Sequence, residues 1–194
     1  SGSGLVAISR GSGVLRVGSA DTSTVFSGVI SGAGGLEKVG SGDLVLTGIN
    51  TFGFGRGAGL PVVSIKGGSL TVGSDQALGS SVGDGSIHLE NGAILRFNNS
   101  VTLDSRRGIE FVGFGGKVEV DEALNVVIPA ELSGTGAFEK LGAGSLQLTA
   151  SNGGFFGDTS VSGGHLQVDG LNPATATCLN GGSSNICGGI EPIS

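Results

Sequence analysis

One segment of the sequence occurs twice. "GAGGLEKVGSGDLVLTG" at 32–48 returns, altered, as "GTGAFEKLGAGSLQLTA" at 134–150, and the two copies align without gaps. The residues of the first copy that are identical in the second are Gly32, Gly34, Glu37, Lys38, Gly40, Gly42, Leu44, Leu46 and Thr47. Internal repeats are typical of folds in which successive units stack on one another, so this repeat favours a solenoid.

The rest of the pattern is that of short β-strands. Of 194 residues 41 are Gly, and apolar residues recur at i and i+2 instead of the helical i, i+3 and i+4. Between 87 and 128, the runs "IHL", "ILRF", "VTL", "IEF", "KVEV" and "LNVVI" follow one another at short, even intervals. This spacing also fits a sandwich or a barrel, but the turn dipeptides "NG" and "DG" occur only five times, fewer than a series of hairpins would use. The internal repeat therefore favours an all-β solenoid over a sandwich or a barrel.

Three strands of about eight residues predict a turn of about 24 residues, and turns stacked about 4.8 Å apart predict roughly eight turns in a column about 40 Å long. Strand alternation predicts which side chains point into the column. Expected to point inward are Leu44, Leu46, Leu70, Val72, Leu95, Phe97, Val118, Val120, Leu146, Leu148, Leu166 and Val168. Expected to point outward are Val45, Thr71, Arg96, Glu119 and Gln147.

The repeat resembles a known family. "GAGGLEKVGSGDLVLTGINTF", followed by "VSIKGGSLTVGSDQALG", is similar to the autotransporter-associated β-strand repeat of passenger domains in Gram-negative type V secretion. The second copy continues to "SNGGFFGDTSVSGGHLQVDG" but lacks the Asn-Thr-aromatic and Ala-Leu-Gly elements, and the first carries the insertion "FGFGRGAGLP", predicted to be a protruding loop. The resemblance implies a right-handed parallel β-helix that is secreted or displayed on the cell surface, within a longer chain that ends in a β-barrel translocator.

These observations predict two regions. Residues 1–170 should form the solenoid, with repeats at 32–79 and 134–170, and residues 171–194 should form a C-terminal loop or cap. Cys178 and Cys187 are the two cysteines, in "CLNGGSSNIC". In an exported protein we expect them to form a structural disulfide, which would stabilise by roughly 2 to 3 kcal/mol in the chain-entropy model. A metal site is not expected, because only His88 and His165 could add further soft ligands.

The charge balance bears on the partners. The formal net charge is -6 and the 10 basic residues are scattered, "SRR" at 105–107 being the one adjacent pair, so we expect no nucleic-acid partner. No apolar run approaches the roughly 20 residues that span a bilayer, so we expect no membrane insertion. The start "SGSGLVAISR" lacks the features of a signal peptide, which suggests a mature, trimmed or excerpted chain.

No catalytic or cofactor-binding residues are predicted. Asp121 and Glu122 are adjacent and would face opposite ways on a strand, while Asp84, Glu90, Asp104 and Glu110 lie in separate segments. The Glu-Lys pairs at 37–38 and 139–140 are expected to mark a corner of the repeat, with one residue of each pair exposed. "GFGRGAG" at 53–59 lacks the Lys-Ser/Thr ending of a phosphate-binding loop.

The function hypothesis is therefore a non-enzymatic module for adhesion, self-association or scaffolding. Its partners would be a host-surface glycan or protein, or another copy of the chain. Two alternatives stay open. Parallel β-helices also serve as carbohydrate-active lyases or hydrolases, which need carboxylates grouped on one face, and as parts of secreted toxins.

Overall fold

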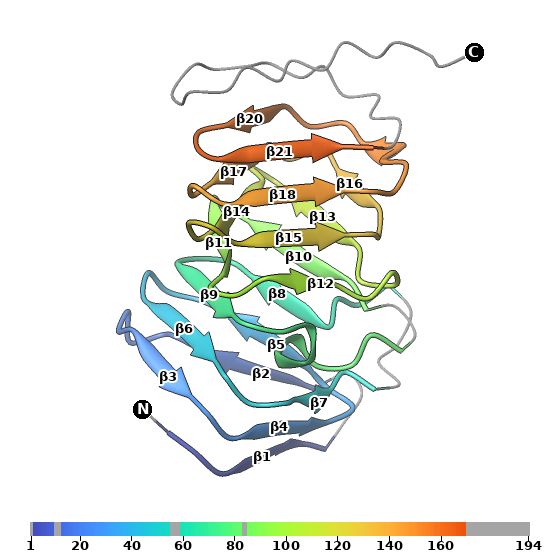
Figure 1. The fold of residues 1–194 in the computed structure, drawn as a ribbon. Helices are drawn as coiled ribbons and strands as arrows, with labels where there is room; N and C mark the ends of the chain where they lie inside the picture. The colour runs from blue at the N-terminus through green and yellow to red at the C-terminus, as the bar shows by residue number, and fades with distance from the viewer. Residues whose placement is uncertain (1, 10–12, 55–58, 83–84, 170–194) are drawn as a thin grey trace, which may run out of the picture.

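The strands form one column of stacked, parallel turns (Figure 1). The computed structural model describes residues 2–9, 13–54, 59–82 and 85–169. Every pairing between named strands in these residues is parallel, and two of the sheets contain seven strands each, one strand from each turn. The predicted parallel solenoid with three strands per turn is confirmed, with seven turns in the described residues.

The column has three sides, and the chain visits them in the same order in each turn. Sheet one contains β2 (Val14–Val17), β5 (Gly35–Lys38), β8 (Val63–Ile65), β10 (Ile87–Glu90), β13 (Ile109–Val112), β16 (Leu132–Gly134) and β19 (Gly154–Phe155). Sheet two contains β3 (Thr24–Phe26), β6 (Asp43–Leu46), β9 (Ser69–Val72), β11 (Ala93–Phe97), β14 (Gly116–Val120), β17 (Phe138–Leu141) and β20 (Thr159–Val161).

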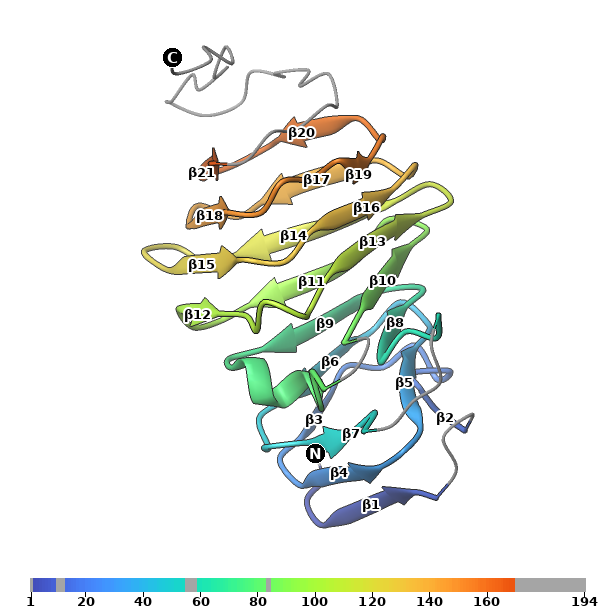
Figure 2. The ribbon, with the colours of Figure 1, turned by 90° about the vertical axis from the view of Figure 1, so that its right-hand side faces the viewer.

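The third side is split into two sheets. Sheet three contains β1 (Leu5–Ile8), β4 (Val29–Gly32) and β7 (Thr51–Phe52). Sheet four contains β12 (Val101–Thr102), β15 (Asn125–Ile128), β18 (Ser145–Leu148) and β21 (His165–Val168). Between the two, a single turn of 3-10 helix, η1 (Asp75–Leu78), takes the place of a strand (Figure 2).

The turns of the column are not all of the predicted length. In a short turn Val126 pairs with Leu146, whereas in a longer one Leu36 pairs with Val63. The longer turn contains the insertion at 52–61, and the strands on either side of the insertion keep their parallel register. Within that insertion Phe52 is buried in the core, whereas Phe54 is exposed. The insertion is therefore accommodated without disturbing the stacking of the turns.

The predicted inward row is largely confirmed. Ten of its twelve members are buried: Leu44, Leu46, Leu70, Val72, Leu95, Phe97, Val118, Val120, Leu146 and Leu148. The other two lie in β21, where Leu166 is half-buried and Val168 is 38% exposed. Both belong to the last described turn and pair with β18 on one side, so no further described turn covers them.

One residue that was predicted to point outward, Thr71, is buried. Thr71 is only 4% exposed, although it shares its register position with Val45 and Arg96, which lie on the outer face. Its hydroxyl donates a hydrogen bond to Asp43 Oδ1 at 2.9 Å. Thr71 therefore faces outward as expected but is covered by its neighbours, which the alternation pattern alone does not reveal.

The repeated glycines are corner residues. Gly134 has φ +100°, and a Cβ there would lie 2.3 Å from the carbonyl oxygen of Phe111 on the preceding turn. The equivalent Gly32 has φ +104°, with the Ile8 oxygen 2.1 Å from a Cβ. Both positions need a left-handed backbone and close approach between turns, which only Gly allows without strain.

Lys38 and Lys140 are almost completely buried, and each points its ammonium group at a corner. The Nζ atom of Lys38 donates to the carbonyl oxygens of Val39, Gly40 and Gly67 at 2.8, 3.0 and 3.1 Å. The Nζ atom of Lys140 donates in the same way to the oxygens of Leu141, Gly142 and Gly163. The prediction that the Glu-Lys pairs mark a corner is confirmed, with the glutamate outside and the lysine inside.

The protein environment shifts the ionisation of both corner lysines. Burial lowers the pKa of Lys38, and it lowers the pKa of Lys140 to about 8. The carbonyl oxygens around each Nζ replace hydrogen bonds lost from water and so offset part of the cost of burial.

The two copies of the repeat lie on different sides of the column. Glu37 and Lys38 belong to β5 in sheet one, whereas Glu139 and Lys140 belong to β17 in sheet two. The motif therefore specifies a local corner and not a particular side of the column.

Two buried asparagines also make the same contact in two places. Asn50 Oδ1 accepts a hydrogen bond from the Ile30 amide and Asn152 Oδ1 accepts one from the Leu132 amide, both at 2.8 Å.

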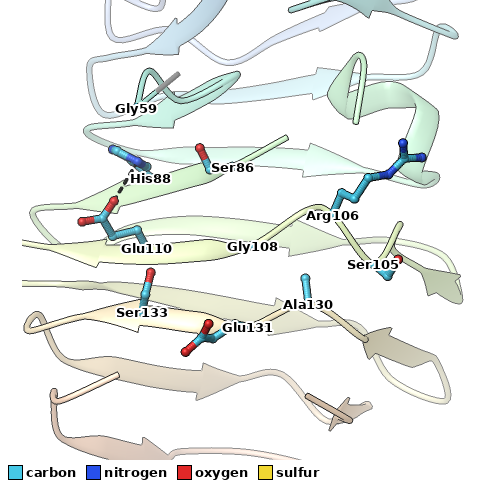
Figure 3. Close-up of a pocket in the computed structure, with 10 residues that line it drawn as sticks. All are labelled: Gly59, Ser86, His88, Ser105, Arg106, Gly108, Glu110, Ala130, Glu131 and Ser133. Atoms are coloured by element: carbon cyan, nitrogen blue, oxygen red, sulfur yellow. Dashed lines mark ion pairs between the residues drawn. The ribbon is translucent and has the colours of Figure 1, made fainter. Parts of the chain in front are cut away.

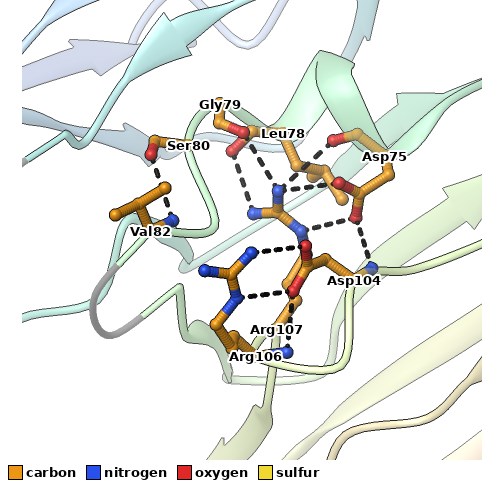
Figure 4. Close-up of polar contacts among 8 residues, drawn as sticks. All are labelled: Asp75, Leu78, Gly79, Ser80, Val82, Asp104, Arg106 and Arg107. Carbon is orange, nitrogen blue, oxygen red and sulfur yellow. Dashed lines mark hydrogen bonds and ion pairs between the residues drawn. The ribbon is translucent and has the colours of Figure 1, made fainter.

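A buried arginine fixes η1 in the gap between sheets three and four (Figure 4). Arg107 is fully buried, and its Nε and Nη2 atoms donate to the two carboxylate oxygens of Asp75 at 2.7 and 3.1 Å. Its Nη2 atom also donates to the Gly79 carbonyl oxygen at 3.0 Å. The neighbouring Arg106 is paired with Asp104. The "SRR" pair thus serves the structure, and neither guanidinium is a free phosphate ligand.

Candidate functional site

A row of polar side chains runs along the outer face of sheet one. The strand register places one of them on each successive turn, and adjacent rungs of a parallel sheet are about 4.8 Å apart. The members in order along the column are Arg16, Glu37, Ser64, His88, Glu110 and Ser133. We call this set the sheet-one row.

Ion pairs link the first part of the sheet-one row. Glu37 contacts Arg16 through Oε1 at 3.0 Å and Lys66 through Oε2 at 3.2 Å. Lys66 also lies 3.7 Å from Glu90 Oε1. The hydrogen bond from Lys66 to Glu37 raises the pKa of Lys66. Because exposed ion pairs of this kind contribute only about 0 to 1 kcal/mol, the fold depends little on these side chains.

The second part of the row borders a hollow that is open to solvent (Figure 3). The hollow has a volume of about 370 Å³ and lies over the beginnings of β10, β13 and β16. Its lining residues are Gly59, Ser86, His88, Ser105, Arg106, Gly108, Glu110, Ala130, Glu131 and Ser133. A second, smaller hollow of about 250 Å³ adjoins Glu37, Lys66 and Glu90 on the same sheet. The outer face of sheet one therefore has two hollows, and polar and charged side chains line part of each.

Most charged groups of the larger hollow are paired. His88 Nε2 lies 2.9 Å from Glu110 Oε2, and the two side chains point toward each other from adjacent turns (Figure 3). Glu131 Oε1 accepts the Gly154 amide at 2.7 Å. Arg106 donates through Nε and Nη2 to Asp104, each at 3.0 Å, and this contact lowers the pKa of Asp104.

The structure also places the acids named from the sequence. Glu90 and Glu110, separate in the chain, lie on adjacent turns of sheet one because the coil brings them together. Asp121 and Glu122 are not on a strand, which corrects that expectation. They follow β14 in a turn, where Asp121 Oδ1 accepts a hydrogen bond from Arg96 at 2.9 Å. Asp84 lies outside the described residues.

The remaining predicted residues fall into two groups. His88 and His165 both lie on the outer face, in sheets one and four. Cys178 and Cys187 lie outside the described residues, so their disulfide stays a prediction. Among the residues that the structure describes, no group of three or more His, Cys, Asp or Glu is placed to hold a metal ion. None of the helical segments in those residues is long and apolar enough to cross a membrane.

Sequence reasoning missed the pairing of His88 with Glu110 and the hollow beside it. Both depend on the length of the turn from β10 to β13. The one available signal is the approximate periodicity of the strands, which places position 88 close to position 110 but is not sharp enough to fix the register.

Comparisons with known proteins agree with this architecture. The family described as Passenger-associated-transport-repeat matches residues 36–53 and 138–168, which lie within the two copies of the repeat. The adhesin BmaC autotransporter of Brucella suis biovar 1 (strain 1330) is 33% identical over 158 residues, which is 79% of this chain. The chain is an autotransporter passenger segment. No solved structure gives a significant match.

This assignment indicates where the segment is found in the cell and how much of the relative it represents. A passenger segment of this kind is secreted or displayed on the surface of a Gram-negative bacterium. The aligned part of the passenger segment covers 4% of the length of the Brucella relative. The predicted resemblance to autotransporter passenger domains is thereby confirmed.

Proposed function

We propose that this passenger segment is a non-enzymatic adhesion module whose sheet-one face contacts a glycan or protein on a host surface. The observation that carries the proposal is the 33% identity, over 79% of the chain, to a protein that is itself named an adhesin. The sheet-one row supports it, because its side chains are polar, of both charge signs and regularly spaced along the column.

The arrangement of the hollow favours adhesion over hydrolysis. A glycosidase needs one carboxylic acid and one carboxylate free to act on either side of the scissile bond. Glu110 pairs through one oxygen with His88, and Glu131 accepts the Gly154 amide through one oxygen, so neither carboxylate of the hollow has both oxygens free. Scaffolding and self-association use the same exposed sheets and are alternatives that the experiment below separates.

The proposal extends to the division of the chain. Under this proposal residues 1–170 make up the solenoid with its repeats at 32–79 and 134–170, and residues 171–194 a C-terminal loop or cap closed by a Cys178–Cys187 disulfide. An end cap suits a solenoid because each turn is stabilised mainly by its nearest neighbours.

Attachment of beads coated with the 194-residue chain to cultured mammalian cells tests the adhesion proposal. The double variant Glu37→Ala with Lys66→Ala removes an ion pair of 3.2 Å from sheet one. The matched control Lys117→Ala with Glu139→Ala removes one of 2.9 Å from sheet two. We expect the first variant to reduce attachment several-fold and the control to leave it unchanged, with melting temperatures close to that of the wild type in both cases.

Equal attachment by both variants would contradict the assignment to sheet one. Clumping of the coated beads with one another, in place of attachment to cells, would identify the module as self-associating.

A further inference from the structure

The larger hollow of sheet one has the volume of a small-molecule site. Its volume of about 370 Å³ lies at the lower end of the roughly 300 to 1,000 Å³ typical of such sites. Gly108, which precedes β13 and lies beside Ser86 and Glu131 of the neighbouring turns, contributes no side chain to the floor of the hollow. A Cβ at Gly108 would lie 3.2 Å from the Glu131 carbonyl oxygen, so this part of the floor is backbone alone.

The groups directed at this space are suited to hydroxyl groups of a ligand. In the described part of the chain, the side-chain oxygens of Ser86, Ser105 and Ser133 make no hydrogen bond. Glu110 uses Oε2 for His88 and keeps Oε1 available. A serine hydroxyl both donates and accepts, as a sugar hydroxyl does, and a carboxylate oxygen accepts. The hollow thus offers oxygen atoms from three successive turns and the adjoining loop.

The charges of the hollow select against an anionic ligand. Glu110 and Glu131 contribute two carboxylates, whereas the guanidinium of Arg106 is already paired with Asp104 and the imidazole of His88 with Glu110. A sialic acid, a phosphate or a nucleotide would bring a further negative charge next to these groups. A neutral sugar brings none and can use every free oxygen.

We propose that this hollow binds one neutral sugar residue, a hexose or an N-acetylhexosamine, at the end of a host-surface glycan. The inference deepens the adhesion proposal and rests on it. No Phe, Tyr or Trp lines the hollow in the described part of the chain, so the sugar is held mainly by hydrogen bonds and a single site binds weakly. Display of many copies on one cell turns weak sites into firm attachment through effective concentration.

Nuclear magnetic resonance titration of the 194-residue chain with free sugars tests this inference. The probes are D-galactose and N-acetyl-D-glucosamine, with sialyllactose as the anionic comparison and trilysine as a basic peptide. We expect a neutral sugar to shift the signals of His88, Glu110 and Ser133 and to leave sheet two unchanged. Ser133→Ile fills the hollow with an apolar side chain, and Ser160→Ile makes the same change on the outer face of β20 in sheet two.

Ser133→Ile should weaken binding about tenfold or more, since it removes a hydroxyl and occupies the space, while Ser160→Ile should leave binding unchanged. Failure of both sugars to bind, tighter binding of sialyllactose or trilysine, or unchanged binding by Ser133→Ile would each overturn the inference. Cell attachment that depends on Glu37 and Lys66 without sugar binding would overturn the inference and leave the adhesion proposal standing. Sugar binding by a chain whose coated beads attach to no cells would instead leave the inference standing and contradict the adhesion proposal.

Discussion

Leu46→Asp is expected to abolish cooperative folding of the column or to leave it barely stable. Leu46 is 1% exposed and lies in register between Phe26 and Val72, inside the core. A carboxylate at this position has no partner, and burying it costs several kcal/mol, a large share of the roughly 5 to 15 kcal/mol that stabilises a typical domain.

The neighbouring substitution Val45→Asp is the control. Val45 faces outward on the same strand, so a carboxylate there stays hydrated and should lower the free energy of unfolding by less than about 1 kcal/mol. Urea denaturation followed by circular dichroism measures both changes. Equal sensitivity at positions 45 and 46 would show that the inward and outward faces of β6 have been assigned incorrectly.

Arg107→Met is expected to lower the free energy of unfolding by about 3 to 5 kcal/mol, as breaking a buried ion pair does. The substitution leaves the Asp75 carboxylate and the Gly79 carbonyl oxygen without the donor that holds η1 in place. Arg107→Lys keeps the charge but cannot form the two-point contact with Asp75, so its loss should be intermediate.

Arg106→Met provides the matched comparison one residue away. The Arg106 side chain is 54% exposed, and because exposed ion pairs contribute little to stability, Arg106→Met should be much less costly than Arg107→Met. Denaturation midpoints measure all three variants. If Arg106→Met proved as costly as Arg107→Met, the buried guanidinium would not be what secures η1.

The repeated residues made the architecture predictable because they occupy positions with strict physical requirements. Gly32 and Gly134 are needed where the backbone is left-handed and turns approach closely. Lys38 and Lys140 are needed where three corner carbonyls converge. The same requirements occur in both copies, so they are visible as a repeat, and they concern stability more than binding.

The candidate site could not be predicted in the same way, because it depends on which turns lie next to each other. The pair formed by His88 and Glu110 and the pair formed by Glu37 and Lys66 each join neighbouring turns of different lengths. The insertion at 52–61 and the replacement of a strand by η1 change those lengths locally. Alternation likewise predicted the direction of Thr71 but not its burial, which depends on Asp43 of the adjacent strand.

Carboxylate labelling of the chain bound to host-cell membranes, read out by mass spectrometry, locates the contact surface directly. Carbodiimide coupling modifies exposed Asp and Glu side chains and is blocked where a partner covers them. If sheet one is the adhesive face, binding should protect Glu37, Glu90 and Glu110 and leave Glu119, Asp121 and Glu139 on the sheet-two side as reactive as in the free chain. Protection of the sheet-two side instead, or equal labelling of all six in the bound and free chain, would contradict adhesion through sheet one.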